Sequence, residues 1–382
     1  MSYLEYNTRT VPTGLRKVLH VQWALVVLLI AVACYGFVML YSVAGGDTER
    51  WMRPQMERFA FGLVVMLVIG FVPIWFWRSI AGVAYLVALL LLLGVEFFGS
   101  VGMGAKRWLV IGPLRLQPSE LAKITSILAL AAYFDWLDIK KVSHPFWVLI
   151  AAVIALLPVL LVVRQPDLGT ALLLSVVGVA VIFAAGVHWA YFAAVTAMAV
   201  GAVAAVMGSR GTEWQILKDY QYRRIDSFLD PTLDPLGAGY HVNQSMIALG
   251  SGGWSGRGFM EGTQARLNFL PEKHTDFIFT TLAEEFGFLG AISLLVLYLM
   301  VMAFCLVVAV RTTNRFASLV VVGVVANFFL YFAVNMAMVM GLAPVVGVPL
   351  PLVSYGGSAM IVLMVGFGLV QSAEIHRPRL PT

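Results

Sequence analysis

The stretch that decides the fold is Leu168 to Ser209, LGTALLLSVVGVAVIFAAGVHWAYFAAVTAMAVGAVAAVMGS, which contains no Asp, Glu, Lys or Arg. A hydrocarbon core about 30 Å thick requires roughly 20 consecutive apolar residues in a helix. The run is therefore long enough for two membrane-spanning helices, and Gly186-Val187-His188 is the natural turn between them. Runs of this length exclude a transmembrane β-barrel, whose strands need only about 10 alternating residues.

The composition of the whole chain agrees with a membrane protein. Of its 382 residues, 60% are hydrophobic and 12% are charged, whereas a soluble domain usually has about 25% charged residues. This composition excludes a soluble enzyme, a disordered tail protein and a coiled coil. The net charge of +5 is too small to suggest nucleic acid as a partner. Cys34 and Cys305 both lie inside apolar runs, so no disulfide framework or cysteine metal site follows from them.

Further apolar segments lie on both sides of this run. They are Val18 to Gly46, Phe59 to Trp77, Ser79 to Val95, Leu121 to Trp136, Val142 to Val163, Asp276 to Val310, and Phe316 to Ala373, the last being long enough for two helices separated by Pro344, Pro349 and Pro351. We therefore predict an all-α integral membrane protein with ten transmembrane helices. Residues 1–382 would form a single polytopic membrane domain.

The distribution of basic residues predicts the orientation. An even number of helices places both termini on one side, and the short segments on that side carry more Lys and Arg than those on the other. By the positive-inside rule this bias favours an orientation in which both termini are cytoplasmic. Residues 208–275 would then form one long extracytoplasmic loop between helices 7 and 8, and loops of this length are usually functional or disordered.

Charged side chains near helix ends are the functional candidates, because charge at membrane depth is costly. Glu120 and Lys123 are three residues apart and share a helix face. They either neutralise each other to preserve the helix, or Lys123 faces a cavity and meets a phosphate or a sugar. The two interpretations are compatible.

Several carboxylates have a simpler structural interpretation beside a functional one. Asp276 opens the eighth helix and could cap it, or Thr275 could be the cap and leave Asp276 free at the membrane boundary. Glu284 and Glu285 lie deeper and are more readily structural. Asp167 is an N-cap-like carboxylate or an ion-pair partner of Arg164.

Arg107 and Trp108 are expected in the loop before the fourth helix, with Lys106 and Arg115 nearby. An aromatic ring beside cations suits a pyrophosphate or a sugar face, and it equally suits an anchor at headgroup level. The sequence has no Walker A motif, no Gly-x-Ser-x-Gly and no His-Glu-x-x-His. Any chemistry must then draw its energy from the substrate, and a lipid-linked pyrophosphate would meet that need. No metal is assigned, although a divalent cation (Mg or Mn) is possible.

Five long motifs, in order along the chain, carry a family resemblance. They are GAKRWLVIGPLRLQPSELAK (Gly104–Lys123), RQPDLGTA (Arg164–Ala171), DYQYRRIDSFLDPTLDPLGAGYHVNQSMIALGSGG (Asp219–Gly253), NFLPEKHTDFIFTTLAEEFGFLG (Asn268–Gly290) and GLAPVVGVPLPLVSYGGS (Gly341–Ser358). Together they resemble the SEDS family (shape, elongation, division and sporulation) of bacterial membrane proteins. The forms GTQARLNFLPEKHTDFIF (Gly262–Phe279) and DPTLDPLGAGYH (Asp230–His241) are similar to the RodA-like branch more than to the FtsW-like one.

The resemblance implies a peptidoglycan glycosyltransferase of the cytoplasmic (inner) membrane, active at its periplasmic face during cell elongation. Such proteins polymerise lipid II, release undecaprenyl pyrophosphate and work with a class B penicillin-binding protein, a transpeptidase, and other elongation-complex proteins. The family's catalytic aspartate matches Asp276, which would act as general base. The substrate-binding candidates are Trp108, Lys123, Glu120, Arg107, Arg224, Gln264 and His274. A flippase or transporter of a lipid-linked precursor, or a non-catalytic scaffold for a penicillin-binding protein, remain the alternatives.

Overall fold

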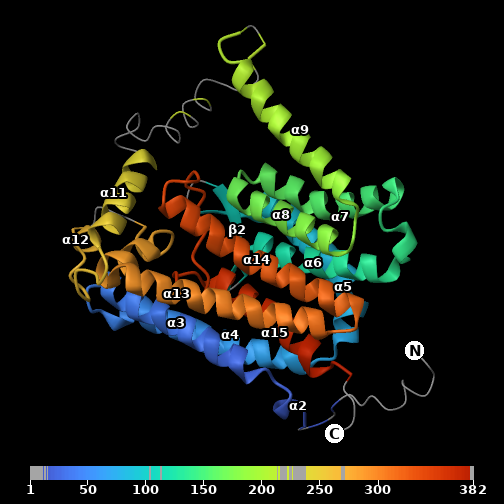
Figure 1. Cartoon of the computed structure of the whole chain (residues 1–382), viewed down its shortest axis with the longest axis horizontal. Helices are drawn as coiled ribbons and strands as arrows, with labels where there is room; N and C mark the ends of the chain where they lie inside the picture. The colour runs from blue at the N-terminus through green and yellow to red at the C-terminus, as the bar shows by residue number, and fades with distance from the viewer. Residues whose placement is uncertain are drawn as a thin grey trace.

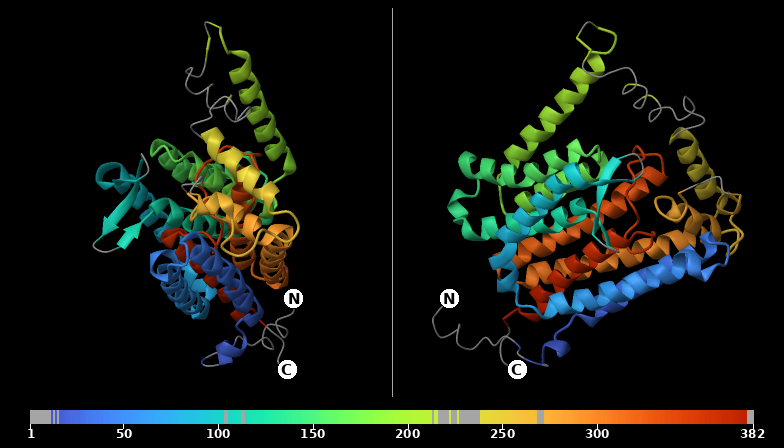
Figure 2. Two further views of the ribbon diagram at one scale, coloured as in Figure 1. Left: turned by 90° about the vertical axis from the view of Figure 1, so that its left-hand side faces the viewer. Right: turned by 180° about the vertical axis from the view of Figure 1, so that it is seen from behind.

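The computed structural model describes residues 12, 14, 16–102, 105–111, 114–212, 214–215, 222, 226, 238–267 and 272–378. The described chain is predominantly helical (Figures 1 and 2). Its main elements are α2 (Arg16–Leu19), α3 (Trp23–Val43), the π-helix η1 (Thr48–Met52), α4 (Arg53–Phe71), α5 (Ile74–Phe98), α6 (Pro118–Trp136), the 3₁₀-helix η2 (Ile139–Lys141), α7 (Pro145–Arg164), α8 (Leu168–Ala184), α9 (Trp189–Gly208), α11 (Ala238–Ser251), α12 (Thr263–Arg266), α13 (Ile278–Arg311), α14 (Arg315–Val339) and α15 (Gly357–Ile375).

Eight of these helices are long and apolar enough to cross a membrane: α3, the continuous η1–α4, α5, α7, α9, α13, α14 and α15. The helix α8 is apolar but shorter, with 17 residues. The predicted turn at 186–188 is confirmed, because α8 and α9 meet there and Gly186 adopts a left-handed φ of 94°. The predicted division of 316–373 is also confirmed, since the irregular segment 340–356 separates α14 from α15.

Two predicted helix boundaries are wrong. The sequence predicted one helix ending at Trp77 and the next beginning at Ser79, but α4 ends at Phe71 and α5 already begins at Ile74. Pro73 provides the break as the N-cap residue of α5, because proline lacks the amide hydrogen that a continuing helix requires. Arg78 therefore lies inside α5, and its Nε is 2.7 Å from Oδ2 of Asp135 on α6. The pairing explains how a charge fits within a helix of this kind.

The predicted all-helical class is confirmed for the bundle, but the sequence did not predict a small antiparallel sheet with the strand order β1-β2-β3. Its strands are β1 (Ser100–Gly102), β2 (Ala105–Ile111) and β3 (Leu114–Leu116), between α5 and α6. Arg107 and Trp108 therefore belong to a strand and not to a loop. The strands are too short, and too rich in glycine and charge, to give a clear two-residue hydrophobic period.

The core of the bundle is built around α15, and α9 lies apart from it. The most apolar window of α15 is 83% buried, whereas none of the corresponding window of α9 is buried, and α9 projects from the bundle in Figure 1. Glycines allow α4 and α15 to approach closely, as small residues do at membrane helix interfaces. A Cβ at Gly62 would lie 2.9 Å from Cγ of Met364, and one at Gly368 would lie 2.8 Å from Cβ of Ile69.

The helix α13 is kinked at Gly287, whose φ of 66° and ψ of −161° are not helical. Beyond the kink, Phe288 N donates to Gly253 O at 2.9 Å and Leu289 N donates to Trp254 O at 3.1 Å. The kink therefore exchanges helical hydrogen bonds for bonds to the segment 252–267. That segment is fixed to the bundle just beyond the start of α13.

Candidate functional site

Asp276 lies in the turn before α13 and not within the helix. The helix begins at Ile278 after Phe277, and no side chain caps it, so the prediction that Asp276 or Thr275 is the cap is wrong. The turn is closed locally instead, because Thr275 N and Phe277 N both donate to Glu272 O, at 3.2 and 3.3 Å.

The backbone around Asp276 is held by α14 and by the segment 340–356. Asn335 on α14 donates from Nδ2 to Asp276 O at 2.9 Å and to Val348 O at 2.7 Å. Ser354 Oγ donates to Thr275 O at 2.5 Å, and Tyr355 N donates to His274 O at 2.9 Å. The backbone carbonyls of His274, Thr275 and Asp276 therefore all accept hydrogen bonds from α14 or from the segment 340–356.

The carboxylate of Asp276 receives no hydrogen bond and no ion pair from the residues that the structure describes. Burial, and secondarily the charge of Glu272, raises the pKa of Asp276 to about 6. A carboxyl group with a pKa near the working pH can accept a proton efficiently. Gly347 leaves space beside it, because even an added Cβ would remain 3.6 Å from Asp276 Oδ2. The carboxylate of Asp276 can therefore accept a proton from a group that enters this space.

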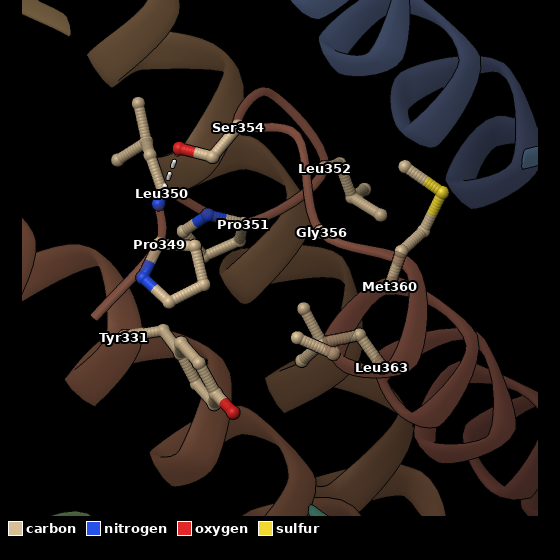
Figure 3. Close-up of a pocket in the computed structure, with 10 residues that line it drawn as sticks. Tyr331, Pro349, Leu350, Pro351, Leu352, Ser354, Gly356, Met360 and Leu363 are labelled. Carbon is tan, nitrogen blue, oxygen red and sulfur yellow. Dashed lines mark hydrogen bonds between the residues drawn. The ribbon is translucent and has the colours of Figure 1, made fainter. Parts of the chain in front are cut away.

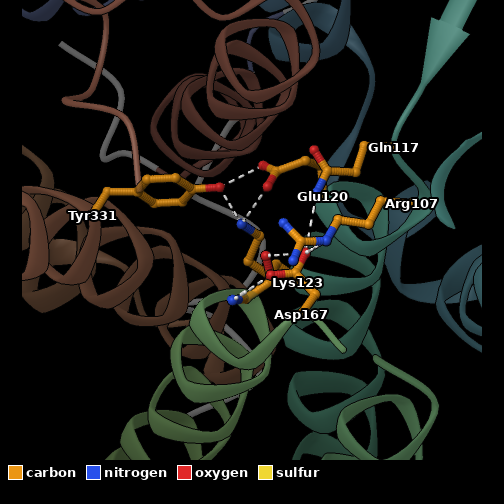
Figure 4. A network of polar contacts seen from close by, with 7 residues as sticks. Arg107, Gln117, Glu120, Lys123, Asp167 and Tyr331 are labelled. Atoms are coloured by element: carbon orange, nitrogen blue, oxygen red, sulfur yellow. Dashed lines mark hydrogen bonds and ion pairs between the residues drawn. The ribbon is translucent and has the colours of Figure 1, made fainter. Parts of the chain in front are cut away.

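A buried polar cluster joins α6 to α14 (Figure 4). Lys123 Nζ donates to Glu120 Oε1 at 2.7 Å and to the hydroxyl of Tyr331, and that hydroxyl donates to Glu120 Oε2 at 2.5 Å. The predicted contact of Glu120 with Lys123 is confirmed, and both residues are buried. Tyr331 was not anticipated, because one tyrosine in an apolar helix gives no sequence signal of its role.

Asp167 joins the α6 cluster to the β-sheet. Its Oδ1 accepts from Thr170 N at 3.3 Å, so the predicted N-cap role is confirmed for α8. Its Oδ2 lies 3.7 Å from Arg107 Nε and accepts from Gln117 Nε2 at 3.5 Å. The alternative ion pair with Arg164 is wrong, since Arg164 is exposed and Arg107 on β2 occupies that place. The pairing of Arg107 with Asp167 depends on how the β-sheet folds, so the sequence alone did not show it.

A small cavity runs behind the segment 340–356, between the Tyr331 cluster and the start of α15 (Figure 3). It is lined by Tyr331, Pro349, Leu350, Pro351, Leu352, Ser354, Gly356, Ala359, Met360 and Leu363. The wall is shaped by Ser354, whose Oγ accepts from Leu350 N at 2.8 Å while it donates to Thr275 O. The two prolines and this bond make the wall rigid, so the same segment positions both Asp276 and the cavity.

His274, two residues before Asp276, belongs to an aromatic stack. Its ring stacks on Trp51 with centroids 4.2 Å apart, and Tyr355 lies edge-on to Trp51 at 4.8 Å. Burial lowers the pKa of His274 below its usual value; Glu272 opposes this shift, while the cations Arg50 and Lys273 add to it. His274 is therefore favoured in its neutral form.

The remaining sequence candidates are more scattered. Trp108 is half-buried on β2, and its carbonyl accepts from Ser100 Oγ at 3.2 Å. Gln264 is held through its backbone N by Glu284, and its Oε1 is buried without a partner. Glu284 also accepts from Thr263 N at 2.7 Å, which confirms its structural role. Arg224 lies outside the described residues.

No group of three or more His, Cys, Asp or Glu side chains within the described ranges is arranged to hold a metal ion. The described candidates comprise one unpaired carboxylate, a buried Lys–Glu–Tyr cluster, and an aromatic stack beside cations. Such an arrangement can remove a proton from a hydroxyl beside an anionic, sugar-bearing ligand.

The comparisons with known proteins agree on one family. The family model described as "Cell cycle protein", which covers FtsW, RodA and SpoVE, matches residues 22–379. Peptidoglycan glycosyltransferase MrdB of Escherichia coli K12 is 42% identical over 363 residues, which cover 94% of this chain and 95% of that protein. Peptidoglycan glycosyltransferase RodA of Treponema pallidum is 32% identical over 433 aligned residues, covering 95% and 99%.

Two solved structures have the same fold over almost the whole chain. A chain from a peptidoglycan synthase complex, described as coordinating polymerization and crosslinking, superposes with a TM-score of 0.80 at 31% identity and covers 93% of this chain and 97% of its own. The rod shape determining protein RodA of Thermus thermophilus superposes with a TM-score of 0.68 at 28% identity, covering 94% and 97%. With a family model spanning nearly all of its residues and relatives of this identity over matching lengths, the chain belongs to the FtsW/RodA/SpoVE family, the SEDS family that its motifs resemble.

Proposed function

We propose that this chain is a peptidoglycan glycosyltransferase that polymerises lipid II into glycan strands. The observation that carries the proposal is Asp276: a half-buried carboxylate with a pKa raised to about 6 and no partner among the described residues. The similarity to proteins named peptidoglycan glycosyltransferase over nearly their full length supports this activity.

The proposed reaction is glycosyl transfer between two lipid-linked chains. The 4-hydroxyl of the acceptor's N-acetylglucosamine attacks the anomeric carbon of the donor's N-acetylmuramic acid. Asp276 takes the hydroxyl proton, the new glycosidic bond forms, and undecaprenyl pyrophosphate leaves with the electron pair of the broken bond. General-base assistance of this kind contributes about 10²–10⁴-fold to a rate.

Cations on the α6 side would stabilise the charge of the leaving pyrophosphate. Lys123 and Arg107 are the described candidates, and Arg224 is the candidate outside the described residues. Glu120 positions Lys123, since the two are joined at 2.7 Å. Trp108, Gln264 and His274 would contact sugars or the phosphate. A divalent cation could share the neutralisation of the pyrophosphate, but no step of the reaction depends on it here.

The proposal includes ten membrane crossings with both termini in the cytoplasm. To the eight long apolar helices it adds α8 and α6, whose Glu120 and Lys123 neutralise each other. An even number is supported by the proximity of the start of α3 to the end of α15, where Gln22 N donates to Gln371 Oε1 at 2.9 Å. Residues 208–275 would then be extracytoplasmic, and Asp276 would face the periplasm from the inner membrane.

We further propose a class B penicillin-binding protein, a transpeptidase, as partner, together with other elongation-complex proteins. The support is the similarity to a chain from a peptidoglycan synthase complex, with a TM-score of 0.80. The projecting helix α9 and the apolar faces of the bundle leave room for partner helices in the membrane.

The decisive experiment is polymerisation of purified lipid II by the full chain in nanodiscs, compared with Asp276→Asn. We expect long glycan strands from the unaltered chain and a loss of at least 10²-fold in the variant, with unchanged folding. The neighbouring substitution Glu272→Gln, which keeps Asp276, is the matched control and should retain most activity. Normal polymer from Asp276→Asn would refute the base assignment. Movement of labelled lipid II across the bilayer without a change in mass would instead support a flippase.

A further inference from the structure

Arg58 on α4 is a half-buried cation for which the described part of the chain supplies no carboxylate. Its guanidinium carbon lies 4.6 Å from the ring centroid of Tyr355, and one terminal nitrogen is sealed from solvent without any hydrogen-bond partner. Arg53, five residues earlier, is exposed and pairs with both Glu49 and Glu57. A buried donor left without an acceptor is costly, and more so when it is charged. One donor of Arg58 is therefore unsatisfied, and the described residues supply no acceptor for it.

The immediate surroundings of Arg58 are suited to an anion. A Cβ on Gly357, the first residue of α15, would lie 3.3 Å from Arg58 Nε, so the guanidinium lies against the start of this 19-residue helix. No side chain caps α15 and its first turn contains no acid, which leaves the positive end of its dipole uncompensated. Gln55, fully buried, donates to Ser354 O at 2.8 Å, and its Oε1 has no partner.

A further cation lies beside the same aromatic stack. Arg50 is 5.5 Å from the ring centroid of Trp51, and the Trp51 ring lies 4.8 Å from that of Tyr355, which Arg58 contacts. Like charges gathered in one place repel each other, and a bound anion relieves that repulsion.

We propose that Arg58, together with Arg50 at the Trp51–His274–Tyr355 stack, forms a pyrophosphate-binding subsite on the α4–α15 side of Asp276. This subsite is separate from the Lys123 and Arg107 side. The inference rests on the proposed function in one respect: joining two lipid-linked chains requires two pyrophosphates to be held at once. Tyr355 N donates to His274 O, two residues before Asp276, so an anion held here would lie beside the reacting group.

The test is direct binding by the full chain, carrying Asp276→Asn so that nothing is turned over, in phosphatidylcholine nanodiscs. The probe is undecaprenyl pyrophosphate, and undecaprenol, which lacks phosphate, is the reference. We expect Arg58→Gln to weaken binding of the pyrophosphate probe at least tenfold. Arg53→Gln, the matched control on the same helix, should change it less than twofold. Unchanged affinity in Arg58→Gln would overturn the proposal.

A phospholipid headgroup offers similar phosphate chemistry, and a second arm separates the two sources. Phosphatidylglycerol retained on the purified protein is measured by mass spectrometry for the parent chain and for Arg58→Gln. If the variant loses only the phospholipid and still binds undecaprenyl pyrophosphate like the parent, the occupant is a headgroup and the pyrophosphate assignment is wrong. Loss of the pyrophosphate probe supports the assignment.

If Arg58 had a purely structural role, Arg58→Met would lower the Tm of the protein, and a binding role predicts the opposite. Removing an unpaired buried charge should leave the Tm of Arg58→Met equal to or above that of the parent, while the Tm increase caused by the probe should disappear. Arg58→Lys keeps the charge and should retain more affinity than Arg58→Met. Equal binding by both variants would refute the subsite. If the unaltered chain fails to polymerise lipid II while Arg58-dependent binding persists, only the proposed function fails.

Discussion

Asp276 shows how surroundings give one residue its chemistry. The folded environment raises its pKa to about 6 from a usual value of 3.8, chiefly by burial. Because the folded pKa exceeds the unfolded one, the protonated form is the one favoured by folding. This contribution to stability is complete below about pH 3.8 and is lost as the pH rises through 6. At neutral pH Asp276 thus lowers stability, as expected of a residue kept for function.

The raised pKa predicts a pH profile for polymerisation. A general base must be ionised, so kcat/KM should fall about tenfold per pH unit below pH 6 and be flat above it. An aspartate with an ordinary pKa would retain activity to about pH 4. The measurement is initial rate of lipid II polymerisation from pH 4.5 to 8.5. Binding by Asp276→Asn over the same range is the control for ionisation of the substrate itself. A flat rate profile down to pH 5 would contradict the prediction.

Tyr331 should matter to activity because it positions Glu120 and Lys123. Tyr331→Phe removes the hydroxyl that joins these two residues and leaves Glu120 Oε2 without its bond. We expect the free energy of unfolding to fall by about 1–3 kcal/mol, because a buried acceptor loses its hydrogen bond. We also expect kcat/KM to fall roughly tenfold, because a displaced Lys123 ammonium would stabilise the transition state less well, by about 1.4 kcal/mol.

The control for Tyr331→Phe is Tyr85→Phe, which removes a half-buried hydroxyl on α5 that donates to Ile154 O on α7 at 2.8 Å. This control should lower stability alone. If both variants lose stability and keep kcat/KM, Tyr331 is structural only.

At the scale of elements, the kink of α13 connects the bundle to the segment that carries Gln264. Gly287 has a φ of 66°, and a Cβ there would lie 2.3 Å from Gly256 N. Backbone conformations of this kind are essentially restricted to glycine. Gly287→Ala should therefore lower stability by about 1–3 kcal/mol and loosen the segment 252–267.

Hydrogen exchange of residues 252–267 would measure that loosening, with polymerisation as a second readout. Gly94→Ala in α5, where a Cβ meets nothing within 4 Å, is the matched control. It should be neutral or slightly stabilising, because alanine is the better helix former. Unchanged exchange in Gly287→Ala would show that the kink does not hold the segment.

At the scale of the whole molecule, the bundle consists of a tightly packed part around α15 and a helix, α9, outside it. Gly368→Leu places a side chain where even a Cβ would lie 2.8 Å from Cβ of Ile69 and 2.9 Å from Met66 O. Overpacking costs about 1–3 kcal/mol, so we expect a lower Tm and a displaced Arg58 subsite. Gly201→Leu on α9, with nothing within 4 Å, should change stability by less than about 0.5 kcal/mol. Equal Tm values for the two variants would contradict this division of the bundle.

The sequence by itself determined that the chain is a helical membrane protein and placed most of its helices. Hydrophobic run length is a local property, and the turn at 186–188 and the contact of Glu120 with Lys123 follow from spacing within one segment. The family motifs also singled out Asp276 and His274. These inferences need no knowledge of which helices are neighbours.

Only the tertiary structure decided what surrounds those residues. Asn335, Tyr331 and Ser354 reach the site from segments far along the chain, and Arg107 takes the place expected for Arg164 beside Asp167. The sheet at 100–116 and the unpaired state of Arg58 also depend on packing between distant segments. Burial, pKa and pairing are properties of neighbours in space, and the order of residues along the chain does not contain them.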